Sequence, residues 1–202
     1  MTGTLLITGF GSFPGIAANP TEALIERLAA SPPPLPDGFQ AAYAVLPVTW
    51  TMLEAELPRL YADHAPEAIV HFGVAGRRRM ISIETRARNV ASMSRADASG
   101  FCRPQAVLEP EGPRHRASTV PAGTLIEAVN RAGLEARTSR DAGDYLCNAT
   151  LWSSLAAGYP ATFVHVPQLG ERAGMGIDDL ERAGRGIVEA VSERLSRRRA
   201  IT

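Results

Sequence analysis

Lysine is absent from this chain of 202 residues, so all 21 of its basic residues are arginine. Without lysine the protein cannot form a Schiff base with a carbonyl substrate, and it cannot supply the lysine of a P-loop phosphate site. Cysteine is scarce as well. Cys102 and Cys147 are too few for a disulfide scaffold and are typical of a reducing compartment, so each is either a packing residue or a chemical group.

Net charge is also lacking, because 21 acidic residues balance the 21 basic ones. A neutral chain has no field that would gather phosphates, which disfavours a nucleic-acid partner and favours a small molecule. No apolar run is long enough for a membrane span, and residues 1–8 carry no basic leader. We therefore expect a cytoplasmic protein without a membrane partner. The length and the 45% hydrophobic content predict one domain spanning 1–202.

Apolar runs and helical periodicity alternate along the chain, which predicts an α/β fold: a single-domain α/β/α sandwich with a mixed, mostly parallel central sheet. A helix begins at Pro20, with Asn19 as its N-cap. Further helices are expected at 52–61, where Pro58 is an awkward interruption, and at 122–132, 147–157 and 177–198. Strands are expected at 5–10, 41–48, 68–73, 81–90, 135–139 and 162–166. Residues 91–118 form a long connection, typical of a functional flap.

Cys147 stands where a helix is predicted to begin. The amide donors and positive dipole end at that position favour a thiolate, as a nucleophile requires. A backbone N–H beside the sulfur would stabilise an oxyanion. The alternative is a buried small hydrophobe, because free cysteine is among the most buried residue types.

His165 ends an apolar strand, where an imidazole could serve a thiol nucleophile. A satisfied core histidine is the alternative. Glu84 follows the apolar residues 81–83 and offers a carboxylate that would orient such an imidazole. Burying that carboxylate without a partner would be costly. His71 continues an apolar strand and is interpreted as packing.

Several segments together resemble the pyroglutamyl peptidase I (pyrrolidone-carboxylate peptidase) family of cysteine peptidases, and the resemblance spans nearly the whole chain. The motifs are Thr8–Phe13 followed by Asn19-Pro20, Gly73–Glu84 with Asn89, Cys147-Asn148, and His165-Val166-Pro167. The order Glu84, Cys147, His165 is also the family's order.

The resemblance implies hydrolysis of the amide bond after an N-terminal pyroglutamyl residue, through a thioester and without a metal or organic cofactor. Cys147 would be the nucleophile, His165 the general base and Glu84 the group that orients it. N-terminally blocked peptides are the implied partners, and a homo-oligomer, tetramer or dimer, is the implied assembly. The implied substrate-binding residues are Phe10, Phe13, Asn19 and Val74.

The chain also departs from the family's pattern. Val74 stands where the family commonly has glutamine, Arg77 replaces a glycine, and Thr85 replaces an arginine. The family's oxyanion arginine falls at Ser94, so Arg95, one residue later, is the candidate for that role, together with the Cys147 N–H. Ala149 replaces a histidine of the cysteine motif. An amide hydrolase of altered acyl specificity and a catalytically silent binding protein are therefore kept as alternatives.

Three weaker signals are interpreted as structural. Gly9-Phe10-Gly11 suggests a dinucleotide fingerprint, but Pro14 occupies the position that the third glycine needs. The runs Arg77–Arg79 and Arg197–Arg199 are expected to be solvated surface or a helix end. No cluster of histidine, cysteine and acidic residues has the spacing of a metal site.

Overall fold

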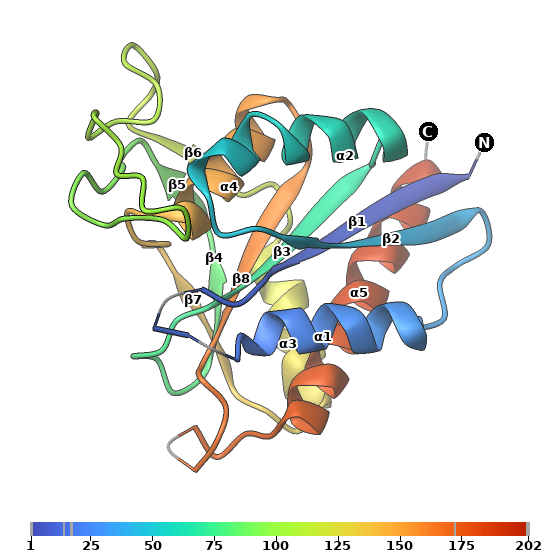
Figure 1. Cartoon of the computed structure of the whole chain (residues 1–202). Coiled ribbons are helices and arrows are strands. Elements are labelled where there is room, and N and C mark those ends of the chain that lie inside the picture. Colours follow the sequence, from blue (N-terminus) through green and yellow to red (C-terminus); the bar gives the residue numbers. More distant parts are fainter. Residues whose placement is uncertain (1, 14, 17, 172, 201–202) are drawn as a thin grey trace.

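A six-stranded sheet occupies the middle of the molecule, in the order β2-β1-β3-β8-β4-β7 (Figure 1). The computed structural model describes residues 2–13, 15–16, 18–171 and 173–200. The strands are β1 (Gly3–Phe10), β2 (Phe39–Leu46), β3 (Ala68–Val74), β4 (Ile81–Glu84), β7 (Ala136–Ser139) and β8 (Ala161–Val166). A separate antiparallel pair joins β5 (Arg86–Arg88) to β6 (His115–Ala117).

Strand β4 gives the sheet its mixed character. The pairs β1–β2, β1–β3, β3–β8 and β4–β7 are parallel, whereas β4 runs antiparallel to β8. In that antiparallel pair Ser82 faces His165 and Glu84 faces Phe163. Consequently β8 lies between β3 and β4, although those two strands follow each other in the chain.

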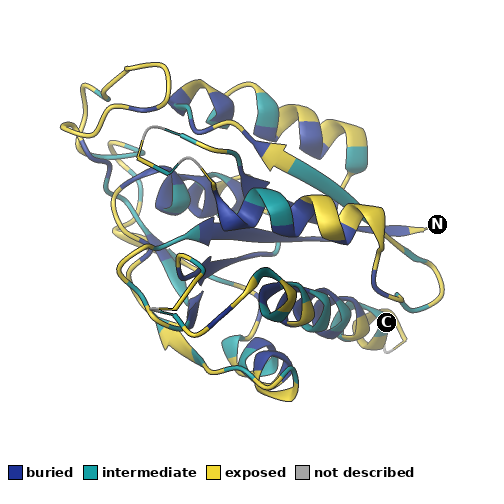
Figure 2. Ribbon diagram, turned by 60° about the horizontal axis from the view of Figure 1, so that its bottom comes forward, coloured by how far each residue is buried: buried dark blue, intermediate teal, exposed yellow. Residues whose placement is uncertain are grey.

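Helices cover both faces of the sheet (Figure 1). On one face lie α1 (Pro20–Ala30), α3 (Ala122–Arg131) and α5 (Ile177–Arg199). On the other lie a 3-10 helix (Trp50–Leu53), α2 (Glu56–His64) and α4 (Leu146–Ala156). The central strands β1, β3 and β8 are buried along their length except at Val74, the last residue of β3 (Figure 2). The predicted fold class, an α/β sandwich with a mixed, mostly parallel sheet, is confirmed.

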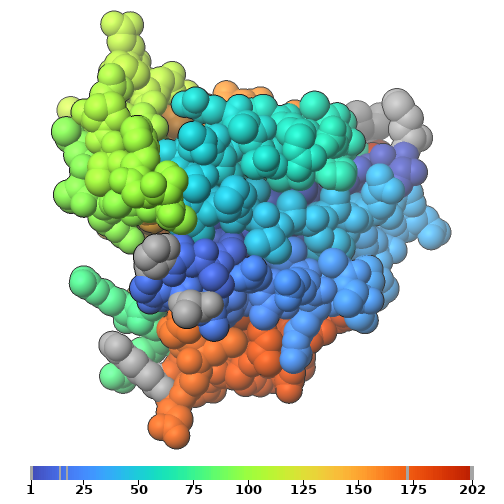
Figure 3. Space-filling view, in the orientation of Figure 1, coloured from blue at the N-terminus to red at the C-terminus, as the bar shows by residue number. Residues whose placement is uncertain are grey.

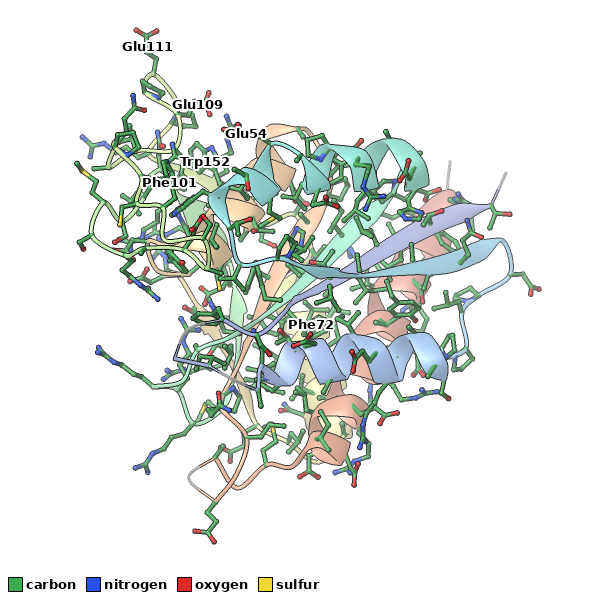
Figure 4. All side chains as sticks on the ribbon, viewed as in Figure 1. Glu54, Phe72, Phe101, Glu109, Glu111 and Trp152 are labelled. Carbon is green, nitrogen blue, oxygen red and sulfur yellow. The ribbon has the colours of Figure 1, made fainter. Side chains whose placement is uncertain are left out.

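Alternation along the strands divides the core into two layers. Phe72, labelled in Figure 4, points toward the layer of α1, α3 and α5. Phe163 points toward the layer of α2 and α4. Gly73, next to Phe72, therefore faces the α4 side, where the site described below is built.

Two predicted elements differ from the structure. The strand expected at 81–90 is divided at Thr85 into β4 and β5, which belong to different sheets. The helix expected at 52–61 is a 3-10 turn followed by α2, which begins at Glu56. Pro58 thus lies in the first turn of α2, where an amide hydrogen has no partner within the helix, so it interrupts nothing.

Residues 91–114 form a lobe beside α4, at the upper left of Figure 3. Phe101 and Glu111 mark its exposed parts in Figure 4. The buried Asp97 carboxylate accepts hydrogen bonds from the N–H groups of Trp50, Ser99 and Phe101. The lobe is therefore ordered by its own polar contacts, and β6 supplies regular structure near the end of the stretch expected to have none.

None of the described helices combines the length and the hydropathy needed to cross a membrane.

Candidate active site

A pocket of about 780 Å³ opens where β1, β3 and β8 end and α4 begins. The carboxyl ends of parallel strands are the usual place for a site in an α/β sheet. The lining comes from segments far apart in the chain: Phe10, Phe13, Asn19, Val48, Val74, Ala75, Gly76, Arg77, Arg78, Arg95, Asp141, Ala142, Gly143, Tyr145, Leu146, Cys147 and His165.

The register of β4 against β8 joins Glu84 to His165. Glu84 lies opposite Phe163, two residues from His165 on the same face, which places the two side chains on a diagonal. His165 Nδ1 lies 2.8 Å from Glu84 Oε1, and both side chains are buried. A carboxylate on Nδ1 accepts that nitrogen's hydrogen and leaves the Nε2 lone pair available.

Arg78 is a third member of this cluster. Its Nη1 donates to Glu84 Oε1 over 2.6 Å, and its Nη2 donates to the Asp141 carbonyl over 2.8 Å. The expectation that residues 77–79 are all solvated surface is therefore wrong at Arg78, although Arg77 and Arg79 are exposed. A buried carboxylate needs a cation, and that requirement at Glu84 is the signal that could have identified Arg78.

The cluster shifts the titration of both its acid and its base. Burial raises the pKa of Glu84, but the hydrogen bond and charge of His165 and the Arg78 guanidinium outweigh it, so the pKa lies below its usual range. Burial lowers the pKa of His165, and Glu84 only partly restores it. The imidazole is therefore neutral near pH 7, as a general base must be.

Gly73 leaves room for the Cys147 thiol beside the Glu84–His165 pair. A Cβ atom on Gly73 would lie 3.0 Å from Cys147 Sγ and 2.6 Å from the Phe163 ring. Gly73 is the register partner of His165 on the neighbouring strand. The missing side chain thus lets the sulfur approach the end of the sheet next to His165.

Burial raises the pKa of Cys147 to about 12, and the positive charge of Arg95 opposes this only in part. The resting thiol is therefore protonated. This direction is opposite to the thiolate expected at the helix start, because burial of the sulfur outweighs the charges of Arg95 and Arg78. A reaction at Cys147 would therefore need a base that removes the thiol proton.

The start of α4 offers unpaired donors to an anion. Its N-cap is Tyr145, whose side chain makes no capping hydrogen bond, so the first amides of the helix have no side-chain cap. Arg95 lies over the Tyr145 ring at 4.2 Å from its centroid. The structure thus brings both candidate oxyanion groups, the Cys147 N–H and Arg95, to one end of the pocket.

The remaining predicted site residues line the same pocket. Phe10, Phe13 and Val74 form an apolar wall. Asn19 is occupied structurally, because its Oδ1 accepts from the Thr21 N–H and its Nδ2 donates to the Gly11 carbonyl. It therefore caps α1 and holds the loop that carries Phe13.

Asn148 is a residue to which the sequence assigned no role. Its Oδ1 accepts from the Arg88 N–H over 2.8 Å, and its Nδ2 donates to the carbonyls of Arg88 and Val90. These bonds tie the first turn of α4 to β5 and to the base of the lobe. His71, by contrast, is buried as expected, with Thr8 and Ser154 on its two nitrogens.

Among the described residues no group of three or more histidine, cysteine or acidic side chains could hold a metal ion. Comparison with known proteins identifies the arrangement, because the family model described as pyroglutamyl peptidase matches residues 3–190. The chain belongs to the pyroglutamyl peptidase family. It is therefore a hydrolase of the omega-peptidase type, and the family supports removal of N-terminal pyroglutamate from peptides.

Relatives in this family match over most of their length. Pyroglutamyl-peptidase 1 of Rattus norvegicus is 30% identical, covering 92% of this chain and 88% of the relative. Pyrrolidone-carboxylate peptidase of Thermococcus onnurineus is 32% identical, covering 84% and 86%. The solved pyrrolidone carboxyl peptidase of Thermococcus litoralis has a TM-score of 0.86 at 26% identity, covering 97% of this chain and 96% of that one.

Proposed function

We propose that this pyroglutamyl peptidase family member works as a cysteine peptidase, with Cys147 as nucleophile, His165 as base and Glu84 as the residue that orients His165. The observation that carries the proposal is the buried His165–Glu84 pair at 2.8 Å, at the edge of a pocket that also holds the Cys147 thiol. The described residues would then act as one catalytic unit.

In the first half of the reaction Cys147 Sγ bonds to the carbonyl carbon of the pyroglutamyl residue. His165 Nε2 takes the thiol proton, and the oxyanion meets the Cys147 N–H and the Arg95 guanidinium. The carbon–nitrogen bond then breaks as His165 returns the proton to the leaving amine. A thioester and a shortened peptide remain.

In the second half water adds to the thioester, with His165 again as base, and releases pyroglutamate and the free thiol. Because the resting thiol and imidazole are both neutral, proton transfer accompanies the attack in place of a preformed ion pair. Glu84 stabilises the imidazolium that forms during each half.

The apolar wall of Phe10, Phe13 and Val74 suits the acyl group, since a neutral five-membered lactam needs apolar contact and few hydrogen bonds. Val74 supports a second candidate function. It places an isopropyl group where the family pattern commonly has an amide, and an amide hydrolase with a different acyl preference would use the same three residues.

A fluorogenic assay with pyroglutamyl-aminomethylcoumarin tests the proposal, with prolyl and alanyl analogues as competitors. We expect the pyroglutamyl amide to be hydrolysed fastest. Cys147→Ser should lower kcat/KM at least about a thousandfold, whereas Cys102→Ser, in the exposed lobe, should leave it unchanged.

Faster turnover of the prolyl or alanyl amide would instead assign the altered acyl specificity. Binding without turnover of any amide would indicate a silent family member. Full activity in Cys147→Ser would overturn the mechanism itself.

A further inference from the structure

The pocket lining is chemically mixed. Phe10, Phe13 and Val74 contribute apolar side chains, and Arg77, Arg78 and Arg95 contribute three guanidinium groups. The neutral pyroglutamyl ring needs the apolar lining and gives the arginines no charged partner. Arginines without a carboxylate of their own are therefore available to the part of the substrate beyond the reacting carbonyl.

Two of these three arginines have no close carboxylate partner within the described residues and can bind an anion of the substrate. Arg78 is bound to Glu84, and the only lining carboxylate, Asp141, pairs with Arg88 at 2.6 Å. Arg95 has a single loose contact, 3.9 Å to Asp144, with both side chains about half exposed. Arg77 is exposed and makes no ion pair with any residue that the structure describes. The other titratable lining groups, Tyr145, Cys147 and His165, are neutral at pH 7. The mouth of the pocket thus carries net positive charge.

Both cations are held beside the reaction centre by the backbone that carries them. Arg95 stacks on Tyr145, two residues before the nucleophile, and its charge reaches the Cys147 thiol. Arg77 lies in the turn between β3 and β4, three residues after Val74 and next to Arg78. Both guanidinium groups thus line the pocket that holds the Cys147 thiol.

We propose that Arg77, together with the N–H groups of Arg95 that do not meet the oxyanion, forms a carboxylate-binding subsite for the leaving side of the substrate. Peptides that carry a carboxylate on the residue directly after the pyroglutamyl group are the preferred substrates. The carboxylate can come from an aspartate or glutamate side chain or from the free C-terminus of a dipeptide. This inference rests on the proposed function and adds the class of leaving group to it.

The experiment compares kcat/KM for three amidated tripeptides, pyroglutamyl-Glu-Ala, pyroglutamyl-Gln-Ala and pyroglutamyl-Lys-Ala amide. We expect the glutamate peptide to exceed the glutamine peptide by about fivefold at low ionic strength, and the lysine peptide to be the slowest. The preference should shrink toward unity at about 1 M salt, where the screening length is about 3 Å. Pyroglutamyl-Ala with a free carboxyl, compared with its amide, tests the C-terminal source.

Arg77→Ala should reduce the ratio of kcat/KM for the glutamate peptide to kcat/KM for the glutamine peptide by about half on a logarithmic scale. Arg77→Glu should favour the lysine peptide over the glutamate peptide. Arg79→Ala is the matched control, since Arg79 is exposed in the same turn but lies outside the pocket lining.

Equal rates for the glutamate, glutamine and lysine peptides would overturn the subsite and leave the proposed function standing. A preference for glutamate that Arg77→Ala and Arg79→Ala reduce equally would also overturn it, because a general surface field would then be the cause. If none of the peptides were cleaved, both the proposed function and the proposed subsite would be overturned.

Discussion

Glu84 is a buried carboxylate whose negative charge is compensated by two side-chain partners. The carboxylate is fully buried, and one oxygen accepts from both the Arg78 guanidinium and the His165 ring. Removing a charge from water costs several kcal/mol unless partners compensate it. Arg78 supplies a permanent charge, so Glu84 would stay ionised while His165 gains and loses a proton in the proposed mechanism.

Arg78 is therefore expected to be a positioning residue for catalysis. Its positive charge disfavours imidazolium, so Arg78→Met should raise the pKa of His165 and move the acid limb of the kcat/KM profile to higher pH. We also expect kcat/KM at pH 7 to fall about tenfold or more, because Glu84 loses a hydrogen bond.

Arg78→Lys should restore much of the lost rate, and Arg79→Met, on the exposed neighbour, should change neither rate nor profile. An Arg78→Met enzyme that loses stability but keeps the native pH profile would show a purely structural role.

The two cysteines should react in an order opposite to the one their proposed roles suggest. Cys102 is exposed, whereas burial holds the pKa of Cys147 at about 12, and only the thiolate alkylates. We expect iodoacetamide at pH 7 to modify Cys102 first, as peptide mapping by mass spectrometry would reveal. Faster labelling of Cys147 would mean that a thiolate is already formed in the resting enzyme.

At the scale of elements, Asn148 connects α4, the helix that carries Cys147, to the β5–β6 pair. Replacing it with alanine would remove three hydrogen bonds to the part-buried backbone groups of Arg88 and Val90. At about 0.5–1.5 kcal/mol for each bond, Asn148→Ala should lower the free energy of unfolding by about 2–4 kcal/mol.

Urea denaturation measures this effect. Asn130→Ala, at an exposed position of α3, should stay within about 0.5 kcal/mol of the native protein. A similarly small effect of Asn148→Ala would show that water replaces the lost bonds.

The elements were predictable where local signals decide them. The N-cap at Asn19, the apolar strands and the long α5 helix all lie close to the positions that periodicity indicates. The division of residues 81–90 at Thr85 was not predictable, since alternation reports which residues are buried and not which sheet they join. A buried carboxylate at Glu84 predicts a nearby cation, but only the tertiary fold shows that Arg78 is the arginine that supplies it.

At the scale of the whole molecule, a buried polar network links the sheet to the helix layer. His71 on β3 contacts Thr8 on β1 and Ser154 on α4, and the Tyr61 hydroxyl lies 2.7 Å from Ser154 Oγ. Burial lowers the pKa of His71 to about 3, so the folded protein keeps this ring neutral at pH values where the unfolded chain protonates it.

This difference predicts acid sensitivity. Between pH 6.5 and about 3 the unfolded state binds one more proton at this site, so stability is full above pH 6.5 and falls by about 1.4 kcal/mol per pH unit below it. The pKa of His165 is also lowered, so this residue likewise makes the folded protein less stable as the pH falls.

Urea titrations measure the free energy of unfolding at pH 5 and pH 7. The difference between the two values should be smaller in His71→Gln than in the native protein. His115→Gln, on the exposed β6, should retain the native pH dependence. Parallel curves for the native protein and His71→Gln would exclude His71 as the source.

The position of β8 between β3 and β4 has a consequence for the synthesis and folding of the chain. Strands β3 and β4 leave the ribosome one after the other, yet they do not pair with each other, and the strand that joins them is made some eighty residues later. Pairing over such a separation is slow to form. His165 lies on that strand, so a nascent chain that ends before β8 lacks the Glu84–His165 pair. Under the proposed mechanism such a chain, although it already contains Cys147, would have no working hydrolytic centre.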